Sequence, residues 1–130
     1  MHIPSLTLAY WCVLVAALLP YLCAYIAKAG AFGGSDNQTP RDWAARQGGW
    51  RARAIASQAN GFEGLPFFIG AVVIAHQLQA VQGRIDLLAA VYVVLRIAFI
   101  ALYIGGMGTA RSAVFALGLL VNIALLFAGR

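Results

Sequence analysis

Long apolar runs, separated by short stretches rich in glycine, proline and charge, occupy most of the chain. About 20 apolar residues in a helix, rising roughly 1.5 Å per residue, cross the hydrocarbon core of a bilayer. The pattern therefore predicts four membrane-spanning helices, at about residues 3–28, 49–80, 84–104 and 111–128. We expect one domain, residues 1–130, folded as an all-α bundle of four transmembrane helices.

The composition also favours a membrane protein. Of the 130 residues, 62% are hydrophobic and only 10% are charged, whereas soluble domains carry about a quarter charged residues. A domain this small cannot bury so much apolar surface within itself, so its expected surroundings are membrane lipids. The net charge of +5 does not predict a nucleic-acid partner, because the arginines lie in or beside apolar runs rather than in a basic patch interleaved with aromatics.

Positive charge predicts the orientation, because lysine and arginine favour the cytoplasmic ends of spanning helices. The first connection holds Lys28, Arg41 and Arg46, and the third holds Arg111. We expect these connections in the cytosol and both termini on the outer, periplasmic side. The excess of arginine over lysine and the compact loops favour a bacterial inner membrane. The N-terminus lacks the basic region of a cleaved signal peptide, so the first helix is expected to be retained.

Polar residues inside an apolar helix are costly unless they are paired or hydrated, and they therefore mark candidate functional sites. At about 100° per residue, Arg53, Asn60 and Glu63 occupy a sector about 80° wide on the second helix. Such a stripe offers hydrogen-bond donors and one acceptor side by side. Gln58 points away from this sector, so we expect it to face another wall of the site or another protomer.

The third and fourth helices carry a similar set. Arg96, Phe99 and Tyr103 are spaced to share one helical face, and Arg111 and Ser112 begin the fourth helix. The direction of the chain brings these residues to the same end of the bundle as the stripe on the second helix. We therefore expect one pocket in the cytosolic half of the membrane, with fixed cations, one carboxylate and a phenol.

Several of these residues also have explanations that need no ligand. Arg53 and Glu63 can neutralise each other, and Asn60 can join two helices by a hydrogen bond. Arginines near a helix end can anchor it at the interface. His76 lies on another face of the second helix, and we expect it to be hydrogen-bonded within the bundle. No second ligand has zinc spacing, so no metal is expected.

The second-helix segment RAIASQANGFE, residues 53–63, followed by GLPFF, resembles the MAPEG family, the membrane-associated proteins of eicosanoid and glutathione metabolism. The family pattern there is R-x-x-R-A-Q-x-N-x-x-E, followed by an apolar P-x-F segment. On the third helix it is arginine, an aromatic and tyrosine, with Arg-Ser after the next turn. The matching positions here are Arg53, Gln58, Asn60, Glu63, Arg96, Phe99, Tyr103, Arg111 and Ser112. The likeness covers essentially the whole chain.

The resemblance implies a homotrimer that binds glutathione, as a co-substrate, between adjacent protomers near the cytosolic face. The glutathione-binding residues it implies are Arg53, Gln58, Asn60, Glu63, Arg96, Tyr103 and Arg111. The catalytic residues it implies are Arg111, Ser112 and Tyr103. The cation of Arg111 would favour the thiolate, which is the nucleophile, and Ser112 would assist by a hydrogen bond.

The expected function is a glutathione transferase or peroxidase that acts in detoxification on lipophilic electrophiles or hydroperoxides arriving through the bilayer. Two departures from the family pattern leave an alternative open. Ala56 replaces the second arginine of the motif, and Phe99 stands where some relatives carry tyrosine or histidine. The alternative is a catalytically silent protein that keeps the fold and binds lipid or a partner protein. A transporter or channel is disfavoured because the sequence lacks inverted repeats and broken helices.

Overall fold

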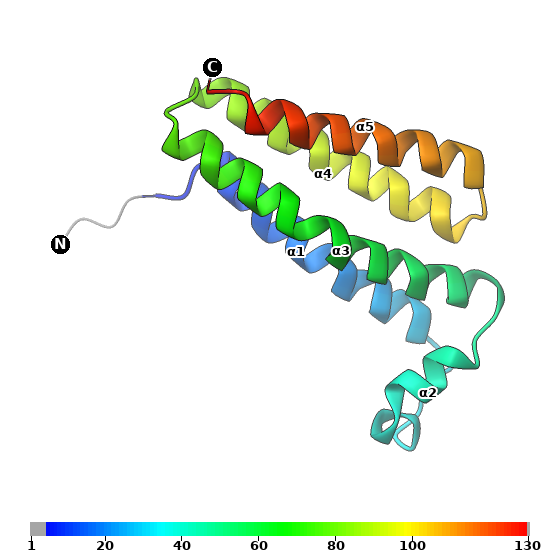
Figure 1. Cartoon of the computed structure of the whole chain (residues 1–130). Helices are drawn as coiled ribbons and strands as arrows, with labels where there is room; N and C mark the ends of the chain where they lie inside the picture. The colour runs from blue at the N-terminus through cyan, green and yellow to red at the C-terminus, as the bar shows by residue number, and fades with distance from the viewer. Residues whose placement is uncertain (1–4, 130) are drawn as a thin grey trace.

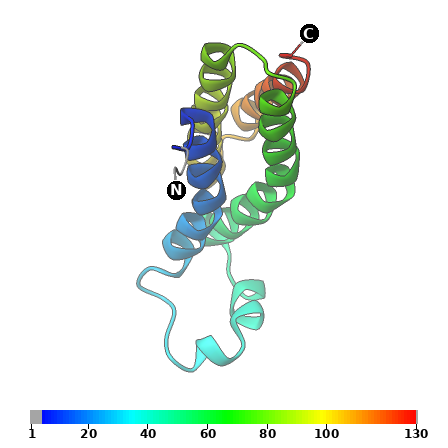
Figure 2. The same cartoon turned by 90° about the vertical axis from the view of Figure 1, so that its left-hand side faces the viewer.

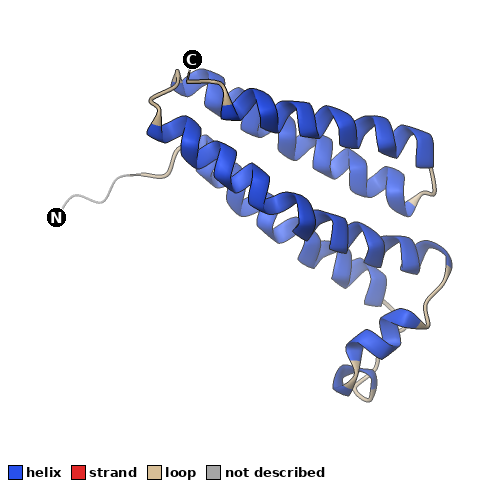
Figure 3. Cartoon of the chain, in the orientation of Figure 1, coloured by secondary structure: helices blue, strands red, loops and turns tan. Residues whose placement is uncertain are grey.

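The computed structural model describes residues 5–129, and every regular element in that range is a helix (Figure 3). The elements are α1 (Leu8–Lys28), the 3-10 helix η1 (Asp36–Gln38), α2 (Pro40–Ala45), α3 (Gly49–Gln77), α4 (Gln82–Ile104) and α5 (Gly108–Leu126). The four longest helices are long and apolar enough to cross a membrane. The predicted all-α fold with four transmembrane helices is therefore confirmed.

The helix boundaries differ slightly from the predicted ones, for local reasons. The predicted start of the first helix, at residue 3, lies outside the described residues, and α1 begins after Thr7, whose side chain caps it by accepting a hydrogen bond from the Tyr10 N–H. The α3 helix ends at Gln77 rather than at 80, because Gln79 adopts a left-handed φ of 58° that a helix cannot continue. The α5 helix begins three residues earlier than predicted, at Gly108.

Helices α1 and α3 lie side by side, as do α4 and α5, and Figure 1 shows the two pairs diverging towards the α4–α5 turn. The main apolar core lies at the opposite end, beside the α3–α4 turn. Alanine and other small residues are frequent in this core, alongside Phe68, Val72, Ile85 and Leu125. Small side chains let membrane helices approach closely. One end of the bundle therefore holds the packed core, and the two helix pairs diverge towards the other end.

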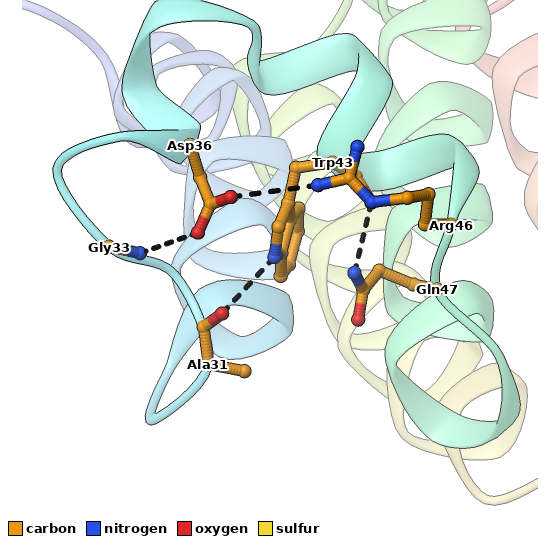
Figure 4. A network of polar contacts seen from close by, with 6 residues as sticks. All are labelled: Ala31, Gly33, Asp36, Trp43, Arg46 and Gln47. Carbon is orange, nitrogen blue, oxygen red and sulfur yellow. Dashed lines mark hydrogen bonds and ion pairs between the residues drawn. The ribbon is translucent and has the colours of Figure 1, made fainter.

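The connection between α1 and α3 folds on itself and projects beyond the long helices (Figures 1 and 2). Its centre is Trp43, which is only 4% exposed and donates its indole N–H to the Ala31 carbonyl at 3.1 Å. The Asp36 carboxylate accepts a hydrogen bond from the Gly33 N–H at 2.9 Å and lies 3.6 Å from the Arg46 guanidinium (Figure 4). Exposed ion pairs contribute little to stability, so the buried indole is the main anchor of this segment.

Candidate functional site

Two contiguous cavities lie between α3, α4 and α5. The outer cavity, of about 220 Å³, lies beside the α4–α5 turn, and Tyr103, Arg111 and Ser112 contribute to its wall. The inner cavity, of about 200 Å³, continues towards the middle of the bundle and is mostly apolar. The side chains that border both cavities are Asn60, Phe99 and Phe115. A ligand placed in one cavity is therefore within reach of the other.

Two arginines flank a pair of aromatic rings along the shared wall. Arg96 is 7% exposed, and its Nη1 donates a hydrogen bond to Asn60 Oδ1 at 3.0 Å. Its guanidinium carbon lies 4.2 Å from the ring centre of Phe99, which in turn contacts Tyr103 edge to face at 5.5 Å. The Arg111 guanidinium stacks on the far side, 4.3 Å from the Tyr103 ring centre. Two fixed cations therefore stand at the ends of one aromatic pair, held by cation–π contacts.

Glu63 lines the inner cavity and is exposed, with no ion pair or hydrogen bond to any residue that the structure describes. Arg53 does not neutralise it, because its Nε donates to the Ile104 carbonyl at 2.9 Å, at the C-terminal end of α4. A carboxylate without a partner is costly within a membrane. Glu63 is therefore available to a cationic group of a ligand or of a neighbouring molecule.

The structure brings together six of the residues predicted from the sequence. They surround the two contiguous cavities and are Asn60, Glu63, Arg96, Tyr103, Arg111 and Ser112. Arg53, which we expected in the same pocket, borders neither cavity. Its cation instead stabilises the C-terminal end of α4, where helix carbonyls lack partners.

Gln58 faces a different cavity, as the helical spacing predicted. This third cavity, of about 270 Å³, lies between α1, α2 and α3 and is bordered by Lys28, Arg41 and Trp43. The amide of Gln58 and the cations of Lys28 and Arg41 therefore lie on the side of α3 away from Glu63.

Two polar residues of the inner cavity were not predicted from the sequence. Asn122 is 3% exposed and comes from the apolar part of α5, and Tyr92 is 4% exposed and stacks on Phe68 at 4.1 Å. The signal for Asn122 was present, since it is the only amide residue in an otherwise apolar span. Tyr92 carries a weaker signal, because its ring is largely apolar and fits an apolar run without a ligand.

His76 is bonded within the bundle, as predicted. Its Nδ1 donates to the Val72 carbonyl at 2.8 Å, and its Nε2 lies 2.8 Å from Thr7 Oγ1. Among residues 5–129, no three His, Cys, Asp or Glu side chains are grouped so as to hold a metal ion. His76 thus joins the start of α1 to the end of α3.

The family model of the MAPEG family matches residues 8–129. This match includes all four spanning helices and every residue of the two contiguous cavities. No curated protein matches the chain, and no solved structure matches it.

Proposed function

The chain belongs to the MAPEG family, and from that premise we propose that it is a glutathione-binding membrane enzyme that conjugates or reduces lipophilic electrophiles or hydroperoxides. Membership makes it an integral membrane protein related to glutathione or eicosanoid metabolism. The finer proposal depends on one observation above all. Two fixed guanidinium groups and an unpaired carboxylate border contiguous cavities within one chain.

The charges of glutathione complement those of the site. Glutathione carries two carboxylates, one ammonium group and a thiol. Glu63 has no partner among residues 5–129 and suits the ammonium group, while Arg96, oriented by Asn60, suits a carboxylate. Arg53 and Tyr103 add a cation and a hydroxyl near the same end. The proposed pairing places the thiol in the outer cavity.

In the outer cavity, Arg111 favours the thiolate, because its fixed positive charge stabilises the sulfur anion. The hydroxyl groups of Ser112 and Tyr103 border the same space and can donate hydrogen bonds to that anion. The thiolate attacks an electrophilic carbon, a carbon–sulfur bond forms, and the leaving group departs with its bonding electrons. The lipophilic co-substrate reaches the site from the bilayer.

A homotrimer is part of the proposal. Gln58 and Lys28 face the third cavity, away from Glu63, so they cannot reach the same ligand molecule as the other site residues within one protomer. A neighbouring protomer would bring this cavity opposite the outer cavity of the first. The cations of the first loop favour the cytosol for this end of the bundle, with both termini on the outer side.

A glutathione binding isotherm on the purified protein tests the proposal. We expect saturable binding at or below millimolar thiol, together with conjugation of a chloronitrobenzene, followed by the absorbance of the thioether. The loop variant Arg46→Ala is a suitable control, since the Arg46 side chain is largely exposed and lies beside Asp36, away from the cavities. Stabilisation by lipid, without any binding of glutathione, would instead support the catalytically silent alternative, which the loss of an arginine at Ala56 favours.

A further inference from the structure

The Arg53 side chain reaches from α3 to the turn between α4 and α5. Its Nε donates a hydrogen bond to the Ile104 carbonyl at 2.9 Å, and a Cβ added to Gly106 would lie 3.6 Å from its guanidinium carbon. Gly106 has a positive φ of 78°, a conformation that glycine adopts without strain. The guanidinium therefore packs directly against the backbone of the turn, because no side chain separates the two.

The turn itself provides hydrogen bonds for two carbonyls at the end of α4. The Met107 N–H donates to the Leu102 carbonyl at 2.9 Å, and the Gly106 N–H donates to the Tyr103 carbonyl at 3.1 Å. This pair of bonds is a common way for a left-handed glycine to end a helix. The Ile104 carbonyl takes its donor from the arginine on α3 instead. Another helix therefore completes the hydrogen bonding of this helix end.

This hydrogen bond also links the two helix pairs where they diverge (Figure 1). Among the described residues, hydrogen bonds join α3 to α4 in this half of the bundle at two points, Arg53 and Asn60. Asn60 lies seven residues further along α3, which corresponds to about 10 Å along the helix axis. The position of the α4–α5 turn relative to α3 therefore depends on Arg53.

The cation that we propose to activate the thiol is attached to the same turn. The Arg111 N–H donates to the Met107 carbonyl at 3.0 Å, in the first turn of α5. The Arg111 guanidinium stacks on the ring of Tyr103, which directly precedes Ile104 in the chain. Because the attraction between a cation and a thiolate weakens with distance, a displacement of the turn would reduce the stabilisation of the thiolate.

We propose that Arg53 is a positioning residue, which holds the α4–α5 turn by its hydrogen bond and thereby keeps Arg111 where it favours the thiolate. This inference rests on the proposed function, because it adds a second task to a residue that the proposed function uses for its charge. Arg53 borders neither of the two contiguous cavities. It therefore acts on the thiol through the turn rather than by contact.

Two substitutions separate the hydrogen bond from the charge. In Arg53→Gln, the amide Nε2 takes the place of the arginine Nε, since both atoms are bonded to Cδ, and it can donate to the Ile104 carbonyl without a charge. In Arg53→Met, neither donor nor charge remains. Both substitutions should weaken glutathione binding to the same extent. Only Arg53→Met should also lower kcat about tenfold near neutral pH and move the pH midpoint of kcat upward by about one unit, because the displaced cation favours the thiolate less.

Arg51→Met is the matched control. Arg51 lies two residues earlier on α3, and its Nη1 donates to the Ala27 and Ala29 carbonyls at the end of α1, each at 2.8 Å. This variant loses the same kind of contact at another helix end, so its pH midpoint should equal that of the wild type even if its stability falls. Equal midpoints in Arg53→Met and Arg53→Gln would overturn the inference. Where Arg53→Met does not fold, Arg53→Gln decides alone: a midpoint near the wild-type value supports the inference, and one as high as that of Arg111→Ala refutes it.

Hydrogen exchange separates this inference from the proposed function. If the wild type neither binds glutathione nor conjugates an electrophile, the proposed function fails, but the exchange of the backbone N–H groups of residues 105–111 still reports on the turn. Exchange there should be faster in Arg53→Met than in the wild type and in Arg51→Met, because the released turn opens more often. Equal exchange in all three proteins would show that Arg53 does not hold the turn.

Discussion

Beside the α3–α4 turn, His76 and Asp86 are paired within the chain, whereas Glu63 in the middle of α3 faces a cavity that continues towards the α4–α5 turn. His76 uses both ring nitrogens, and Asp86 Oδ1 accepts hydrogen bonds from the Ala9 N–H at 3.0 Å and from Gln82 Nε2 at 2.8 Å. Glu63 has no such partner among the described residues. These ionisable side chains therefore differ in whether the described chain itself supplies their partners.

The paired end has a structural explanation. Asp86 lies at the first turn of α1, where a negative charge is stabilised by the unpaired N–H groups of the helix. The ring of Tyr10 stacks on that of His76 at 4.1 Å, so α1, α3 and α4 are joined at one point above the alanine-rich core. Polar residues of this kind join helices and need no ligand.

The comparison shows how to distinguish function from packing in a small membrane protein. Both His76 and Glu63 are ionisable residues of α3, and sequence alone makes each a candidate site. Their different faces of α3 predicted different roles, and the neighbours of each residue now separate them. We therefore expect substitutions at the paired end to change stability, and substitutions around the cavities to change ligand binding and turnover.

Arg111→Ala should produce the largest effect, a loss of conjugation turnover of about 100-fold or more, because the fixed cation beside the thiolate disappears. Stability should change little, since the guanidinium only stacks on Tyr103 within the described chain. Turnover with a chloronitrobenzene and the melting temperature measure the two quantities. Arg84→Ala is the matched control at the paired end, where Arg84 Nη1 donates to the Ala128 carbonyl. Equal turnover in both variants would show that Arg111 does not activate the thiol.

His76→Ala should lower the free energy of unfolding by about 2 kcal/mol, the combined effect of two lost hydrogen bonds. The change also removes the stacking partner of Tyr10 and leaves the Thr7 hydroxyl without the imidazole. Denaturation in detergent measures the loss, and the neighbouring exposed variant Gln77→Ala serves as the control. Glutathione affinity of the folded protein should be unchanged. Normal stability combined with weakened glutathione affinity would instead show that His76 acts in ligand binding.

Glu63→Gln should reduce glutathione affinity about tenfold, because the ammonium group loses a charged hydrogen-bond acceptor. Stability should stay the same or rise, since the carboxylate has no partner in the described part of the chain to lose. Isothermal titration measures the affinity, with Gln38→Ala in the first connection as a control. Normal affinity combined with reduced stability would show that Glu63 is structural after all.

Gly61→Ala should have the smallest effect, a destabilisation of about 1 kcal/mol from overpacking. An added Cβ at Gly61 would lie 2.9 Å from Pro20 Cγ, where α1 and α3 touch. Gly70→Ala is the matched control on the same helix, because an added Cβ there meets no atom within 4 Å. Melting temperatures compare the two variants. Equal stability of both would mean that α1 and α3 can separate at Pro20 without cost.

The sequence alone determined the four spanning helices. The length of an apolar run is a local property, and it can be compared directly with the thickness of the bilayer. It also determined the face shared by Arg96, Phe99 and Tyr103, since helical periodicity places those side chains in contact regardless of other helices. The separation of Gln58 from Glu63 followed from the same periodicity.

Only the tertiary structure decided which polar groups are satisfied. Arg53 shares a helical sector with Glu63, yet it bonds to the end of α4 because that carbonyl lies beside it. Tyr92 on α4 and Asn122 on α5 are distant in sequence from Asn60 and Glu63 on α3. The fold brings all four residues to the wall of the inner cavity. Helical spacing describes one helix at a time, whereas the pairing of a buried polar atom depends on which other helix packs against it.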